Sequence, residues 1–120
     1  MTEIKLVIPE IHPSLNEWAY KWHYRKRAKE KKRWGEMVHW IARPKKPKEP
    51  IEKAEITVIY YFKINRRHDF DNYIPKFILD GLVDVGIIKD DDLKHLNNIN
   101  IIQKVDRQNP RTEVVIKEVI

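Results

Sequence analysis

The segment spanning residues 53–63 constrains the fold most strongly, because its pattern fits a strand and no helix. Every second residue from Ala54 to Phe62 is apolar or aromatic, while the residues between them are mixed. A period of two residues places the apolar side chains on one face of an extended segment. We therefore expect this face to be buried, with the rest of the chain providing further strands and helices around it.

The first half of the chain supplies three of these parts. Residues 4–8 form a short apolar run that ends at Pro9, which predicts a first strand. Within residues 15–41 apolar side chains recur in steps of three and four, which predicts one long helix with buried ends and an exposed basic middle, interrupted near Gly35. The proline-rich residues 43–50 fit neither a helix nor a central strand, so they are interpreted as a loop.

The second half supplies the remaining elements. A second helix is expected at residues 73–85, with Pro75 in its first turn and Gly86 as its C-terminal cap. Strands are expected at residues 95–105 and 112–119, joined by a short turn and paired with each other as an antiparallel hairpin.

The resulting order, β-α-β-α-β-β, predicts an α+β fold. It consists of a small mixed sheet with a C-terminal antiparallel hairpin and two helices packed on the sheet. A chain of 120 residues suits one core, so we expect a single domain over residues 1–120. The absence of Cys excludes a disulfide scaffold, a thiolate zinc site and a Cys nucleophile. With no membrane-length apolar run and no evident signal peptide, a cytoplasmic protein without a membrane partner is expected.

The net charge of +6 is unevenly distributed. Residues 1–50 carry 13 basic and 6 acidic side chains, whereas residues 51–120 carry 11 and 12. The basic run within the first predicted helix favours contacts with phosphates, although a solvated helix face that only aids solubility would look the same. The residues expected to contact DNA are Asn16, Lys21, Arg25, Arg27, Lys29, Lys31, Lys32 and Arg33, together with Arg66 and Arg67.

Four tryptophans lie in the same region. Trp18, Trp22 and Trp34 follow helical spacing and are interpreted as core residues, whereas Trp40 is the one expected to be exposed. An exposed indole ring can stack on an unpaired base.

Two groups of aspartates flank the second predicted helix. Asp69 and Asp71 precede it, and residues 90–92 follow it. Carboxylates that converge repel one another unless a hard cation lies between them, and Mg²⁺ prefers such oxygen ligands. Beside a basic surface, this metal suits phosphodiester hydrolysis, and Lys76 can neutralise charge that builds on the phosphate.

The same aspartates also have a simpler interpretation. Carboxylates before a helix commonly cap it and complement its dipole, and three aspartates after a helix can form an exposed turn. His68 would shift the metal preference toward Mn²⁺ or Zn²⁺ if it were a ligand, but such a histidine is more often a loop residue or a phosphate contact. Spacing alone leaves these interpretations open.

The residues in and around the second helix form a pattern. Asp69-Phe70-Asp71-Asn72 is followed by Lys76, Asp80, Leu82, Gly86 and Asp90-Asp91, and the segment Pro13-Ser14-x-Asn16 lies near the N-terminus. This order resembles the RusA family of Holliday junction resolvases, which shows D-x-D-N, K-x-x-x-D-x-L, a Gly and D-D, preceded by P-S-x-N. The resemblance covers nearly the whole chain.

The resemblance implies a homodimeric, Mg²⁺-dependent endodeoxyribonuclease without a small-molecule cofactor. Such enzymes nick two opposing strands of a four-way DNA junction symmetrically, in recombination and repair. Mn²⁺ is the expected substitute for Mg²⁺. The implied metal ligands are Asp69, Asp71 and Asp91, with Asp90 as a less certain member, and Lys76 is the implied catalytic lysine.

One departure from the family pattern affects the lysine. Lys76 stands five residues after Asp71, where the family pattern has four, and Pro75 is the extra residue. The loop before the helix can absorb this insertion, because Lys76 keeps its spacing to Asp80 and Leu82. Two other functions remain open from the residues alone: a non-catalytic nucleic-acid-binding module, and a protein-interaction domain with a basic docking helix.

Overall fold

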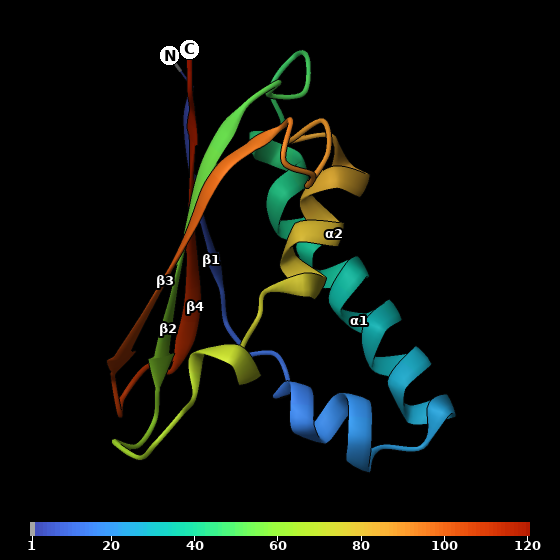
Figure 1. Cartoon of the computed structure of the whole chain (residues 1–120), viewed down its shortest axis with the longest axis vertical. Coiled ribbons are helices and arrows are strands. Elements are labelled where there is room, and N and C mark those ends of the chain that lie inside the picture. The colour runs from blue at the N-terminus through green and yellow to red at the C-terminus, as the bar shows by residue number, and fades with distance from the viewer. Residues whose placement is uncertain (1) are drawn as a thin grey trace.

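The computed structural model describes residues 2–120 and contains a four-stranded mixed sheet with α1 and α2 on one side of it (Figure 1). The element order confirms the predicted α+β class. The main elements are β1 (Glu3–Ile8), α1 (Tyr24–Ala42), β2 (Ala54–Phe62), α2 (Lys76–Val85), β3 (Leu96–Val105) and β4 (Arg111–Glu118). Three short helical turns, η1 (Asn16–Lys21), η2 (Arg43–Lys45) and η3 (Phe70–Asn72), lie between them.

Strand β2 buries every second residue, as its alternation predicts, and it lies inside the sheet. It pairs parallel with β3 and antiparallel with β4, and β4 also pairs antiparallel with β1, so the order is β1-β4-β2-β3. The buried face of β2 packs with alternate residues of β1 and β4 and with the helices. The two edge strands of the sheet are therefore β1 and β3, which are not consecutive in the sequence.

The last two strands run antiparallel and are joined by a short turn, but β2 lies between them. This corrects the predicted direct pairing of the two strands. The physical reason is burial. Thr112, Val114 and Ile116 make β4 suitable for the sheet interior, whereas Leu96 is the one buried residue of β3, which also carries three asparagines and a glutamine.

The long helix predicted over residues 15–41 is divided in two, and the division is not at Gly35. The chain leaves the helical conformation at Trp22 and His23, and the His23 ring accepts a hydrogen bond from the backbone N–H of Arg25 at the start of α1. Gly35 lies within the continuous α1 with open space beside it. Trp34, Val38 and Ala42 recur every four residues and form its buried stripe.

Helix α2 begins at Lys76, three residues later than predicted, and Pro75 precedes its first turn. Ile74 therefore lies outside the helix and is exposed, whereas Phe77, Ile78, Leu82 and Val85 are buried. Gly86 caps the helix with a φ of 91°, a left-handed conformation that favours glycine. Within residues 2–120, no helix has both the length and the apolar character needed to cross a membrane.

Candidate active site

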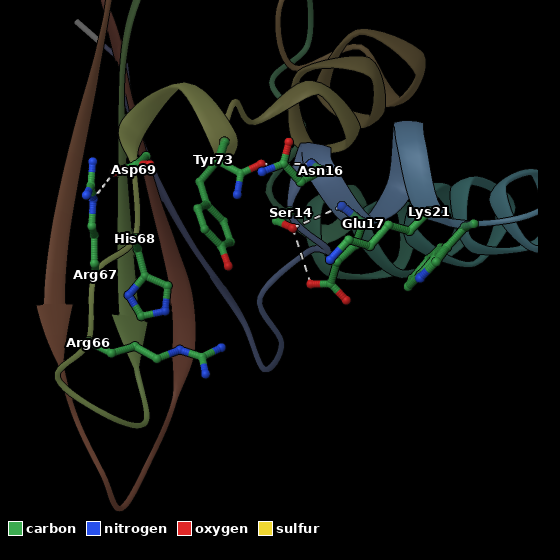
Figure 2. Close-up of a pocket in the computed structure, with 11 residues that line it drawn as sticks. Ser14, Asn16, Glu17, Lys21, Arg66, Arg67, His68, Asp69 and Tyr73 are labelled. Carbon is green, nitrogen blue, oxygen red and sulfur yellow. Dashed lines mark hydrogen bonds and ion pairs between the residues drawn. The ribbon is translucent and has the colours of Figure 1, made fainter.

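A cleft of about 710 Å³ opens where the segment preceding α1 faces the loop between β2 and α2. Figure 2 shows side chains from both segments around this space. The lining residues are Ser14, Asn16, Glu17, Lys21, Trp22, Arg66, Arg67, His68, Asp69, Asn72 and Tyr73. The cleft thus brings together five of the residues that the sequence assigned to DNA binding or to the metal, namely Asn16, Lys21, Arg66, Arg67 and Asp69.

The two walls of the cleft are joined by a hydrogen bond across 56 residues of sequence. The backbone N–H of Asn16 donates to Asn72 Oδ1 over 2.8 Å. On the Asn16 side, the Ser14 hydroxyl donates to Glu17 Oε1 over 3.2 Å and accepts from the Glu17 backbone N–H over 3.3 Å (Figure 2). The P-S-x-N segment is therefore held against the loop that carries Asp69.

A buried chain of polar groups lies behind this cleft. His12, which is 4% exposed, has its Nε2 2.5 Å from the Tyr60 hydroxyl and its Nδ1 2.9 Å from the Pro13 carbonyl oxygen. The Tyr60 hydroxyl donates in turn to the Tyr73 carbonyl oxygen over 3.2 Å. Burial lowers the pKa of His12 and raises the pKa of Tyr60. Sequence reasoning missed His12, because no local pattern distinguishes a buried histidine from one in a loop.

Asp69 stands at the entrance to η3, in the position of a helix cap, but its side chain makes no capping hydrogen bond. It forms an exposed ion pair with Arg67 instead, whose Nε lies 2.8 Å from Asp69 Oδ1. This hydrogen bond raises the pKa of the Arg67 guanidinium. Asp71 is exposed within η3. The Asp69 side chain therefore does not cap η3, and the carboxylates of Asp69 and Asp71 both remain accessible to solvent.

Residues 90–92 lie at the opposite end of α2. The backbone N–H of Asp91 donates to Asp90 Oδ1 over 2.8 Å, and Asp92 Oδ1 lies 2.6 Å from the His95 ring Nδ1. The His95 hydrogen bond lowers the pKa of Asp92. Possible ligand atoms of Asp90, Asp92 and His95 all lie within 4.8 Å of one another, the one such group of three among residues 2–120.

The predicted triad of Asp69, Asp71 and Asp91 does not converge within one described chain. A helix of ten residues separates the first two from the third, and it is about 15 Å long. Asp90 belongs to the group around His95 rather than to the group around Asp69. The assignment of all four aspartates to one metal site therefore stays a prediction.

Lys76 is the first residue of α2 and is exposed. Its Nζ lies 3.6 Å from Asp80 Oδ2, one helical turn further along. The side chains that line the cleft do not include Lys76, which borders a small neighbouring cavity with Trp18 and Phe77. Its catalytic role also stays a prediction.

The basic residues of α1 have two different environments. Arg33 is bound by carboxylates: Glu10 accepts two hydrogen bonds over 2.6 and 2.7 Å, and Glu30 accepts two more. Arg27 donates to the Ala19 carbonyl oxygen over 3.1 Å and thereby holds η1 against the start of α1. The exposed members, which form no ion pair with an acidic side chain of residues 2–120, are Arg25, Lys26, Lys29, Lys31 and Lys32.

The aromatic residues mostly follow the prediction. Trp34 is fully buried, Trp18 packs against the core, and Trp40 is 69% exposed. Trp22 differs, because it is only half-buried and lines the cleft, where the Lys26 ammonium lies 4.0 Å from its ring centre. The His68 ring stacks on Phe62 with a centroid separation of 3.6 Å, which is consistent with a loop residue of the cleft.

Comparison with known proteins identifies the family of this chain. The family model of endodeoxyribonuclease RusA matches residues 10–117, which is nearly the whole chain. The chain therefore belongs to the RusA family and is an endodeoxyribonuclease of the Holliday junction resolvase type. No curated protein matches the chain. The family assignment sets aside both the non-catalytic binding module and the protein-interaction domain.

Proposed function

We propose that this member of the RusA family uses a divalent metal ion, Mg²⁺ or its substitute Mn²⁺, to nick two opposing strands of a four-way DNA junction. The observation that supports this most directly is the position of Asp69. Its carboxylate is exposed at the edge of a cleft whose other charged residues include Lys21, Arg66 and Arg67. In the structure the Arg67 guanidinium neutralises this carboxylate; a divalent cation would replace it as the partner of Asp69 and free Arg67 to bind a phosphate.

The residues present fit such a metal. Asp69 and Asp71 offer exposed carboxylate oxygens two residues apart, and hard oxygen ligands with space for water are the preference of Mg²⁺. When bound, the metal would polarise the scissile phosphate and activate a water molecule. Arg66 and Arg67 are suited to bind the neighbouring phosphates, and Lys76 to neutralise charge near the leaving oxygen.

The separation of Asp91 from Asp69 and Asp71 supports a homodimer. Within one chain Asp91 lies at the far end of α2, so the triad implied by the sequence is incomplete. A second copy that contributes its own Asp91 would complete the ligand set. Two such sites related by a two-fold axis would suit a junction with approximate two-fold symmetry.

The basic surface of η1 and α1 is suited to contact the arms of the junction. Arg25, Lys29, Lys31 and Lys32 are exposed along α1, which follows η1 and runs beside α2 (Figure 1). Contacts to phosphates give affinity with little sequence information, which suits recognition of a branched shape. Trp22 lines the cleft and offers an aromatic face to an unpaired base.

The experiment compares a labelled four-way junction with a linear duplex of the same sequence, each in Mg²⁺, in Mn²⁺ and in EDTA. We expect paired nicks in the junction only, in either metal and not in EDTA. Asp71→Asn should bind the junction and fail to cut it, whereas Asp84→Asn, an exposed aspartate on α2, should cut normally. Equal cutting of the linear duplex would refute junction selectivity, and full activity of Asp71→Asn would refute the metal site.

A further inference from the structure

Strand β3 is an edge strand without the usual protection against pairing. It is ten residues long, and Lys104 is its one charged residue. The opposite edge, β1, has six residues, of which Glu3 and Lys5 are charged and alternate with the buried ones. Natural edge strands are usually short, charged or covered, because free backbone N–H and C=O groups recruit another strand.

The side chains of β3 and its approach are also unusually apolar for an exposed segment. Leu93 is 98% exposed, Val105 is 44% exposed, and Ile99 and Ile102 are each 39% exposed. Beside the first half of the strand lies a groove of about 510 Å³, bordered by residues between Asp91 and Ile99. This edge therefore offers both free backbone groups and apolar contact area, which is the combination that another strand would cover.

The charges at the two ends of β3 identify the strand that fits. Residues 89–94 carry three aspartates against Lys89 and Lys94 before the amino end, a net charge of −1, while Lys104 and Arg107 lie at the carboxyl end. Asp106, the remaining acidic residue there, is paired with Arg111 over 2.8 Å. A second copy of β3 that runs antiparallel brings each acidic end beside a basic end, whereas a parallel copy would place like charges together.

We propose that two copies of this chain join through antiparallel pairing of β3 with β3. This rests on the homodimer of the proposed function and adds its surface. The two four-stranded sheets then form one continuous sheet, with the helices of both copies on the same side. The two-fold axis passes through Asn100, so that Ile99 of each copy lies opposite Ile101 of the other, and four isoleucines meet on one face.

The register follows from the two faces of the strand. Ile99 and Ile101 are in register with Ile56 and Val58 of β2, which are buried on the helix side of the sheet. If both copies keep their helices on one side, paired residues must come from the same face. Centring on Asn100 satisfies this rule and places the isoleucines of the two copies in contact.

The absence of Cys from the chain makes this pairing directly testable. In Asn100→Cys, the two introduced thiols would stand opposite each other, with Cα atoms about 4.5–5.5 Å apart, which is within the range of a disulfide. Mild oxidation of the full chain should therefore give a covalent dimer on a non-reducing gel. Val7→Cys, an exposed position on β1 at the other edge, is the matched control and should remain monomeric on the gel.

A second pair of variants tests the same surface without a disulfide. Ile99→Lys should raise the dimer dissociation constant at least tenfold in sedimentation equilibrium, because it places a charge in the isoleucine cluster. Val7→Lys should leave that constant unchanged. Circular dichroism spectra of both variants check that each is folded.

The outcomes separate this proposal from the proposed function. A monomer at all concentrations, or a dimer that Ile99→Lys does not weaken, would overturn the β3 interface. Equal cross-linking of Asn100→Cys and Val7→Cys would overturn it as well. None of these readouts uses cleavage, so a junction-cutting enzyme that dimerises through another surface would leave the function intact and refute the interface alone.

Discussion

The two ends of α2 carry similar aspartates in different surroundings. At its amino end, Asp69 and Asp71 are exposed near a cleft that Arg66 and Arg67 line, and the Asp69 side chain caps no backbone N–H. At its carboxyl end, Asp92 accepts hydrogen bonds from His95. Asp69 is paired with the exposed side chain of Arg67, whereas Asp92 is held by both the backbone N–H and the ring of His95 in its own turn. Residue type alone does not distinguish a candidate metal ligand from an aspartate that stabilises a turn, whereas the partners of each side chain do.

The largest difference between the two ends should appear in cleavage. Asp69→Asn removes a proposed metal ligand at the cleft, and we expect junction cutting to fall by at least about 100-fold. Asp92→Asn alters a turn and should keep cutting within about threefold, since it leaves the cleft unchanged. Single-turnover cleavage of a labelled junction measures both. Equal losses in the two variants would remove the distinction between the ends.

The next test asks whether the two ends act together across copies. Asp71→Asn and Asp91→Asn should each be inactive alone. If each site is shared between the two copies, a mixed dimer has one intact ligand set and one doubly mutated set. About half of the dimers in an equal mixture are mixed, so about one quarter of the normal nicks should return, each in a single strand. If both ends belong to the same chain, the mixture stays inactive. A denaturing gel that resolves the two cut strands distinguishes these results.

A smaller effect is expected for DNA affinity at the amino end. Replacing both Arg66 and Arg67 with Ala should weaken junction binding and lower the dependence of log K on log[salt] by about 0.9 for each phosphate that the protein no longer neutralises. Lys117→Ala, at an exposed lysine of β4, is the control for general charge and should not change the slope. Binding titrations at several salt concentrations provide the measurement. An unchanged slope in the double variant would exclude the loop from the DNA-binding surface.

The smallest effect concerns stability at the carboxyl end. The His95 hydrogen bond lowers the pKa of Asp92 below its ordinary value of 3.8. Its stabilisation is therefore fully present above this value and is lost as the pH falls through the lower pKa of the folded state. The melting temperature should fall less between pH 6 and pH 3 in Asp92→Asn than in the parent chain. Identical pH profiles would show that the contact does not contribute to folding.

The sequence predicted those features that depend on local periodicity or on a single backbone requirement. The alternation of β2, the stripe of Trp34 and Val38 and the cap at Gly86 belong to this class, because each is decided within a few residues. The order of β3 and β4 was not predictable in the same way. A turn fixes the relative direction of two strands, whereas their neighbours in the sheet depend on burial throughout the domain.

The candidate site shows the same limit. Arg66, Arg67 and Asp69 could be singled out because they lie together in one polar loop, and Asp69 begins the D-x-D-N motif. The hydrogen bond between Asn16 and Asn72 joins residues that only the fold brings together, and the His12–Tyr60 contact likewise has no local signal. The break before α1 was misplaced because glycine is the stronger helix breaker by propensity, yet Gly35 is tolerated within a helix that packing stabilises.

Gly81 sets the spacing between α1 and α2. A Cβ at this position would lie 2.5 Å from Cγ1 of Val38, so α1 and α2 approach each other more closely than any larger residue permits. The basic helix and the helix flanked by aspartates are thus clamped together at a fixed spacing. A larger residue at position 81 would therefore push the two helices apart and shift the loops at both ends of α2 relative to α1.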